Sequence, residues 1–336
     1  MSAPYRLPGF VNAHSHAFQR ALRGKVEGGD FWAWRESMLD VAKCLAPGDV
    51  RSGYAATYAE MRTAGYTAVG EFHYVGLAEA EAAVAAARDA GIELVLLLAA
   101  YGRGGLERFR QPSAAAYLRQ VESLRAAGAQ VGLAPHSVRA CPRDWLEAIG
   151  RYAAEEGLAL HVHAGEQPRE IEECLAEHGL RPVELLAETG CLGPRTTVVH
   201  ATHADERELD LLAEHGAGVC LCPTTEANLG DGFPPLTGLL ERGISLSIGS
   251  DSNVRIDPLE ELRQLEGTAR RQTLRRNVIP VERLLELGSS GGARALGLDA
   301  WPGVEVDLDH RSLSGVERED VPAALVHGCG ADVVVS

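Results

Sequence analysis

The stretch that decides the fold is LPGFVNAHSHAFQR, residues 7–20, which joins an apolar run to two histidines spaced two residues apart. Alternate side chains of a β-strand point to the same face, so His14 and His16 are expected to lie side by side. Neutral imidazole is a good ligand for divalent metal ions. Phe10 and Val11 suit a buried strand of a parallel barrel. The stretch therefore predicts a barrel strand that carries half of a metal site.

Three later apolar stretches end in the same kinds of side chain. His163 ends LALHVH, His200 ends TTVVH, and Asp251 ends ISLSIGSD. Because the carboxyl ends of parallel barrel strands meet at one face, these groups are expected to converge there with the first pair. Three imidazoles and one carboxylate around a hydrolytic metal leave a position for water. His161 shares the parity of His163 but lies further from that face, and Glu166 has left the strand and can carry a proton.

The whole set resembles the deaminase branch of the amidohydrolase superfamily, over about residues 7–300. The motifs that carry this resemblance are His-x-His, His-Ala-Gly-Glu, a strand-end His and Ser-Asp. The finer pattern is similar to the N-formimino-L-glutamate deiminase family. It lies in AFQR, FWAWRE, GEFHYV, APHSVRA and CPTTEANLGDG, which begin at residues 17, 31, 70, 134 and 222.

The resemblance implies one divalent ion per chain, Zn²⁺ or another ion such as Fe²⁺, held by His14, His16, His163 and Asp251. It implies proton transfer by Glu166, His200 and Asp251. It implies substrate contacts by Gln19, Arg35, Tyr74, His136, Arg139 and Ser250. Many binuclear superfamily members bridge two ions with a carboxylated lysine. This chain has lysine only at Lys25 and Lys43, outside the expected barrel strands, which favours a single ion.

The implied reaction is hydrolysis of N-formimino-L-glutamate to N-formyl-L-glutamate and ammonia, a step of histidine degradation. Arg35 and Arg139 would bind the substrate carboxylates, because guanidinium groups pair with carboxylates through two hydrogen bonds. One alternative is an aminohydrolase of a purine-like or pterin-like heterocycle, or of another formimino-amino acid. A second alternative is a non-catalytic metal-binding homologue, which the presence of both Glu166 and His200 disfavours.

Composition limits the partners and the compartment. The chain has 336 residues, 46% of them hydrophobic, and a net charge of −15, which argues against binding to nucleic acid or an anionic membrane. Its seven cysteines form no disulfide framework, and no signal-type or membrane-spanning segment is seen, so we expect a cytoplasmic protein. Cys220 and Cys222 share a strand face, but no second Cys or His pair has matching spacing, which favours a packing role.

Strands and helices are expected to alternate as a (β/α)₈ barrel over residues 7–300. The expected strands are at about 8–15, 67–75, 92–101, 130–138, 158–164, 196–201, 217–222 and 244–250. The expected helices are at about 49–64, 77–90, 113–127, 142–156, 168–188, 204–215 and 234–242, with another from 258.

The chain ends depart from the family pattern. Relatives carry a small β-sandwich built from residues before the first barrel strand and from a C-terminal segment. Here the barrel is expected to begin almost at Met1, so the N-terminal contribution is expected to be absent, and residues 1–6 and 301–336 are expected to form only a reduced remnant. An uncovered apolar flank would favour a homodimer, with the tail near the contact.

Overall fold

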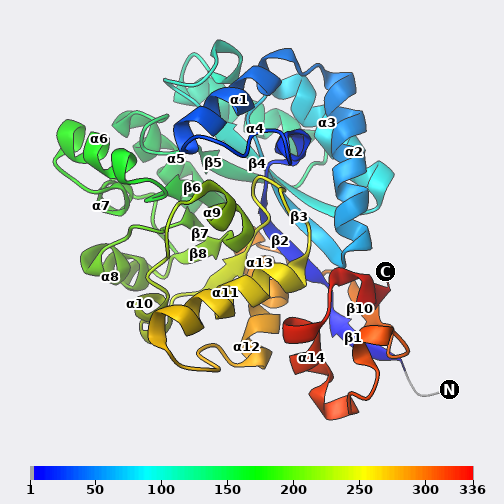
Figure 1. Cartoon of the computed structure of the whole chain (residues 1–336). Helices are drawn as coiled ribbons and strands as arrows, with labels where there is room; N and C mark the ends of the chain where they lie inside the picture. Colours follow the sequence, from blue (N-terminus) through cyan, green and yellow to red (C-terminus); the bar gives the residue numbers. More distant parts are fainter. Residues whose placement is uncertain (1–3, 336) are drawn as a thin grey trace.

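Eight parallel strands form a barrel in chain order, in a computed structural model that describes residues 4–335 (Figure 1). These strands consist mostly of aliphatic residues and are almost entirely buried, as expected for strands covered by helices on the outside. The predicted (β/α)₈ barrel is confirmed. The strands are β2 (Phe10–Ser15), β3 (Tyr66–His73), β4 (Glu93–Ala100), β5 (Val131–Pro135), β6 (Leu160–Ala164), β7 (Thr196–His200), β8 (Gly218–Leu221) and β9 (Leu246–Ile248).

The first and last barrel strands meet through residues of the predicted metal site. The backbone N–H of Asp251, just beyond β9, donates to the carbonyl of His14 at 3.0 Å. The N–H of His16 donates to the carbonyl of Asp251 at 2.8 Å. The seam between β2 and β9 is therefore formed by the same residues whose side chains were predicted to hold a metal.

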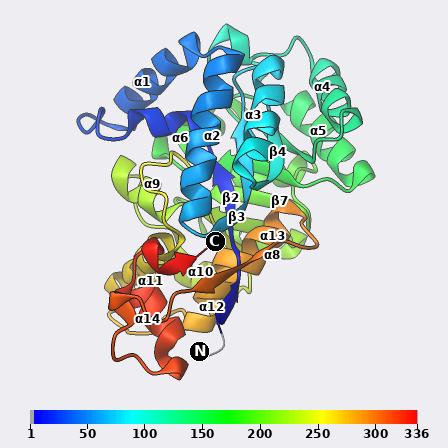
Figure 2. The same ribbon diagram turned by 90° about the vertical axis from the view of Figure 1, so that its right-hand side faces the viewer.

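Helices surround this barrel (Figures 1 and 2). Several of them end at a glycine in the left-handed conformation, which L-residues with a Cβ adopt at a cost. The predicted helix 168–188 is two helices, because Gly179 ends the first at φ 68° and Pro182 begins the second. The helices are α2 (Pro47–Thr63), α3 (Leu77–Ala90), α4 (Ala114–Ala126), α5 (Arg143–Glu156), α6 (Pro168–His178), α7 (Pro182–Glu188), α8 (Glu206–His215), α10 (Leu236–Glu241) and α11 (Pro258–Thr273).

Further helices fall where none was predicted. Helix α1 (Phe31–Cys44) follows the first barrel strand and begins at Asp30, whose carboxylate accepts a hydrogen bond from the N–H of Ala33 at 2.9 Å. Helix α9 (Pro223–Leu229) follows β8 directly. After α11 the chain forms α12 (Val281–Glu286), a π-helical turn at Leu287–Gly291 and α13 (Gly292–Leu296).

Both ends of the described chain build a separate three-stranded sheet. It contains β1 (Tyr5–Pro8), β10 (Gly303–Val306) and β11 (Val334–Val335) in the order β1-β10-β11, with α14 (Val321–Gly328) beside α11 and α12 (Figure 2). The expectation that the N-terminal contribution is absent is therefore wrong, because the segment before Gly9 supplies β1, which pairs with β10. The barrel strand expected at about 8–15 is present as β2 and begins at Phe10. The break falls at Gly9, where a Cβ would lie 2.3 Å from the carbonyl oxygen of Pro302. In residues 4–335, none of the helices is long and apolar enough to cross a membrane.

Candidate metal centre and active site

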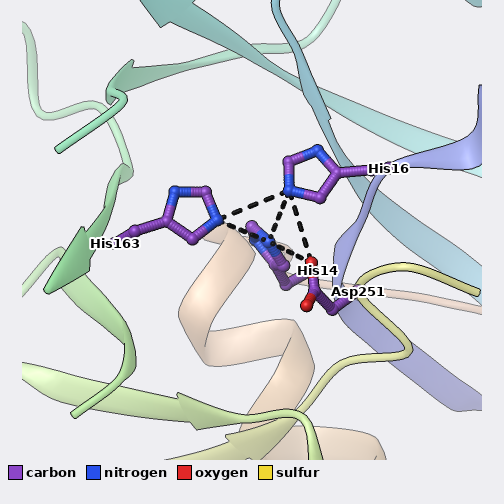
Figure 3. A group of neighbouring side chains, drawn as sticks. All are labelled: His14, His16, His163 and Asp251. Atoms are coloured by element: carbon purple, nitrogen blue, oxygen red, sulfur yellow. Dashed lines mark hydrogen bonds and ion pairs between the residues drawn. The ribbon is translucent and has the colours of Figure 1, made fainter. Parts of the chain in front are cut away.

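The four predicted ligands converge at the carboxyl end of the barrel (Figure 3). The Nε2 atoms of His14, His16 and His163 lie 3.1–3.4 Å from one another. Oδ1 of Asp251 lies 3.3 Å from Nε2 of both His14 and His16. All four side chains are buried. Burial, followed by the neighbouring His16, lowers the pKa of His14 well below its usual value, which favours the neutral form that ligates metals.

The tautomers of these histidines leave their lone pairs facing one another. Nδ1 of His16 donates to the carbonyl of Phe72 at 2.9 Å, and Nδ1 of His163 donates to the carbonyl of His136 at 3.0 Å. Both Nε2 atoms are therefore unprotonated acceptors, and a cation is the group that relieves their repulsion. Two ligand atoms about 2.1 Å from one ion, at 90–110° to each other, are separated by roughly 3.0–3.4 Å. The observed spacing fits one divalent ion.

His200 lies beside this cluster and is held by a carboxylate that sequence reasoning missed. Its Nδ1 donates to Oε1 of Glu226 at 3.2 Å, and its Nε2 lies 3.5 Å from Oε1 of Glu166 and 3.9 Å from Oδ2 of Asp251. Burial lowers the pKa of His200, but these three carboxylates outweigh it and raise the pKa well above the usual value. Burial raises the pKa of Glu166 to about 7, against the opposing effect of His200. Both groups can carry a proton at the site.

The backbone at the site is strained. His200 has φ 73° and Asp251 has φ 43°, a left-handed conformation that is uncommon for residues other than glycine. Such strain persists where the surrounding structure enforces it, and it is concentrated at functional sites. Around Asp251, Nδ2 of Asn253 donates to the Asp251 carbonyl at 3.0 Å, which fixes the turn.

Ser250 belongs to this supporting network rather than to the cavity wall. Its hydroxyl accepts a hydrogen bond from Nδ2 of Asn12 and donates one to Oδ1 of Asn253, both at 2.6 Å, and the residue is fully buried. Ser250 is not among the residues that line the cavity described below, and its contact with substrate stays a prediction. Its side chain has its partners within the protein and supports the turn that carries Asp251.

The other five predicted substrate-binding residues line one cavity above the cluster, together with His16, His163, Glu166, His200 and Asp251. Nε2 of Gln19 donates to the hydroxyl of Tyr74 at 3.0 Å, while the side-chain oxygen of Gln19 is buried without a partner. Nε of Arg139 is likewise buried without a partner. Two residues that line the cavity thus each have a buried polar atom without a hydrogen-bond partner among residues 4–335. The five residues are Gln19, Arg35, Tyr74, His136 and Arg139.

Part of this cavity wall was not predicted. Helix α1 supplies Phe31, Trp34 and Met38 as well as Arg35. Tyr101, which follows β4, lies against His136 with ring centroids 4.5 Å apart. Glu226 lies within the quoted stretch CPTTEANLGDG, but the sequence contained no sign that its carboxylate would reach His200. The helical spacing of apolar residues after Asp30 was a signal that could have revealed α1.

The match to known proteins covers almost the whole chain. Residues 5–303 match the amidohydrolase family. The chain is 40% identical to formimidoylglutamate deiminase of Pseudomonas aeruginosa, over 87% of this chain and 72% of that protein. It is 32% identical to 5-methylthioadenosine/S-adenosylhomocysteine deaminase of Halobacterium salinarum, over 88% of this chain and 69% of that protein. A crystal structure of an adenosine deaminase from Xanthomonas campestris with bound zinc superposes with a TM-score of 0.89 at 25% identity, covering 98% of this chain and 77% of that one.

The chain belongs to the amidohydrolase family. Its barrel, its cluster of three histidines and one aspartate, and its deaminase relatives make it a metal-dependent hydrolase that acts on C–N bonds. Among the relatives, the deiminase from Pseudomonas aeruginosa is the most similar of those described above.

Proposed function

We propose that this enzyme hydrolyses N-formimino-L-glutamate to N-formyl-L-glutamate and ammonia, as a step of histidine degradation. The observation that carries the proposal is the pair of arginines in the cavity. Arg35 contacts the adjacent Glu36 at a long 3.4 Å, and within residues 4–335 Arg139 forms no ion pair. Two cations left available in a protein of net charge −15 suit a substrate with two carboxylates. The identity with the Pseudomonas deiminase supports the same choice.

The residues of the site can divide the chemistry between them. A divalent ion bound by His14, His16, His163 and Asp251 would bring the pKa of a water molecule close to neutral. His200 and Asp251 would orient this water and accept its proton. Glu166, whose Oε1 lies 3.5 Å from Nε2 of His200, would protonate the imino nitrogen so that it leaves as ammonia. An acid is required because an unprotonated amide ion is a very poor leaving group.

Zn²⁺ is the proposed resident ion, because three imidazoles and a carboxylate are common zinc ligands. Fe²⁺ and other divalent ions accept the same donors, so elemental analysis of purified protein decides the identity. We also propose that one ion is bound per chain.

A second candidate is deamination of a purine nucleoside. Phe31, Trp34, Tyr74 and Tyr101 line the cavity and offer faces on which a base could stack. The similarity to the Halobacterium deaminase is consistent with this reading.

A substrate panel separates the two candidates. Ammonia release is measured with N-formimino-L-glutamate, N-formimino-L-aspartate, formamidine, adenosine and 5′-methylthioadenosine on metal-loaded protein. We expect the highest kcat/KM with the glutamate derivative. A higher value with either nucleoside would replace the proposed function by the second candidate.

A further inference from the structure

A second set of metal donors lies directly beside the first. One ligand atom each from His200, Cys222 and Asp251 lies within 4.8 Å of the other two. All three side chains are buried, with exposures of 1%, 0% and 5%. Cys222 follows β8, so its two partners come from different strands, and no local spacing in the sequence could have shown the set. His200 and Asp251 line the cavity, which gives an ion a route from solvent.

The geometry of His200 is that of a metal-binding histidine. Glu226 accepts the hydrogen bond from Nδ1, so that loss of the second ring proton leaves the lone pair on Nε2. This buried Nε2 has no hydrogen-bond partner. Glu226 also accepts from the backbone N–H of Cys222 at 2.9 Å, so one carboxylate holds both His200 and the segment that carries the thiol.

Asp251 can serve both sets. Its Oδ1 faces His14 and His16 at 3.3 Å, while its Oδ2 lies 3.9 Å from Nε2 of His200. A carboxylate with its two oxygens directed to two donor sets can bridge two cations. No lysine is required for this bridge.

We propose that His200, Cys222 and Asp251 form a second, inhibitory site for a soft divalent ion, such as Cd²⁺ or excess Zn²⁺. The thiol of Cys222 and Nε2 of protonated His200 each release a proton to solvent as their bonds to the metal form. Sulfur and imidazole donors favour such ions over Mg²⁺ or Ca²⁺. A bound ion occupies Nε2 of His200 and Oδ2 of Asp251. The predicted inhibition rests on the proposed function, in which His200 and Asp251 move a proton. The predicted binding of the ion is independent of that function.

The test titrates Cd²⁺ into enzyme already loaded with one equivalent of Zn²⁺. The readouts are the ultraviolet absorption of the cadmium–thiolate bond and the metal content after gel filtration. We expect one additional Cd²⁺ per chain in the wild-type protein. Cys222→Ser should abolish the absorption and weaken binding of this ion by at least about tenfold, since even outer-shell changes cost 10–100-fold. Cys191→Ser, another buried cysteine, whose Sγ contacts the carbonyl of Leu146, is the matched control and should behave as wild type.

Several outcomes would overturn the proposal. The first is a wild-type protein that shows no cadmium–thiolate absorption. The second is replacement of Zn²⁺ by Cd²⁺, with a metal content of one ion per chain in total. The third is an absorption that is lost in Cys220→Ser but kept in Cys222→Ser. If Cys222→Ser does not fold, cadmium NMR of the wild-type protein reports sulfur coordination directly. Turnover measured alongside should fall as the absorption rises. Binding without inhibition would overturn the inhibitory part and count against His200 as the base, whereas failure to bind leaves the proposed function untouched.

Discussion

Replacing Glu226 by Gln tests whether the carboxylate behind His200 contributes to turnover. Oε1 of Glu226 accepts from Nδ1 of His200 at 3.2 Å and from the N–H of Cys222 at 2.9 Å, and the residue is 4% exposed. A hydrogen bond to a charged acceptor contributes about 1.5–3 kcal/mol and one to a neutral acceptor about 0.5–1.5 kcal/mol. When His200 becomes protonated, Glu226→Gln replaces the charged acceptor by a neutral one and should therefore remove on the order of 1 kcal/mol of stabilisation, which corresponds to roughly a 5–10-fold lower kcat.

Steady-state ammonia release with N-formimino-L-glutamate gives kcat and KM, and elemental analysis gives the metal content. KM and metal content should stay close to wild type, because Glu226 neither lines the cavity nor belongs to the four-residue cluster. Glu261→Gln is the matched control, since this buried carboxylate also serves α9, through Thr224, and does not contact His200. Equal kcat values in the two variants would refute the reasoning, as would loss of the metal from Glu226→Gln.

Four further predictions address other parts of the molecule. Glu166→Gln should lower kcat by at least about 100-fold at unchanged metal content, and near-normal turnover would remove Glu166 from proton transfer. Arg139→Met should weaken binding of dicarboxylate substrates by roughly 1.5–3 kcal/mol, read as kcat/KM, and an equal loss with uncharged formamidine would make Arg139 structural. Burial lowers the pKa of His73 to about 4, so between this value and 6.5 the unfolded chain binds more protons than the folded one, and stability falls as the pH is lowered through that window. Urea unfolding should show that the free energy of unfolding falls by about 2 kcal/mol more in the wild type than in His73→Gln between about pH 7 and pH 5. Equal losses in the two proteins would contradict the lowered pKa of His73. We also propose a homodimer with the tail Trp301–Ser336 near the contact, which light scattering at the mass of a single 35.8 kDa chain would disprove.

The barrel and the metal cluster could be predicted because each depends on a short-range pattern. Buried parallel strands give continuous apolar runs, and each ligand stands at the end of one such run, as His163 does. The carboxyl ends of all the parallel strands lie on the same face of the barrel. Residues far apart in the chain therefore converge without any need to know their detailed packing.

The remaining features depend on side-chain packing between distant segments. Ser250 was expected at the substrate from the family resemblance, yet its hydroxyl accepts a hydrogen bond from Asn12 of the first barrel strand, 238 residues away in the chain. Glu226 reaches His200 through the unpredicted helix α9, and no spacing in the chain shows that contact. The N-terminal strand was missed because it has only four residues, Tyr5–Pro8, which are too few to give a periodic signal separate from that of the strand after Gly9.

The seam of the barrel sets an order of events for a chain made from its N-terminus. His14 and His16 are synthesised early, and His163 follows midway, but Asp251 and the backbone bonds that close β9 onto β2 come after about three quarters of the chain. Until then the three imidazoles have neither their carboxylate nor a closed barrel to hold them together. A metal ion that binds only when all four ligands are in place stabilises the folded state. Its binding energy therefore stabilises the contact between β2 and β9, which joins strands far apart in the chain. We therefore expect closure of the barrel and binding of the metal to be thermodynamically coupled, each favouring the other.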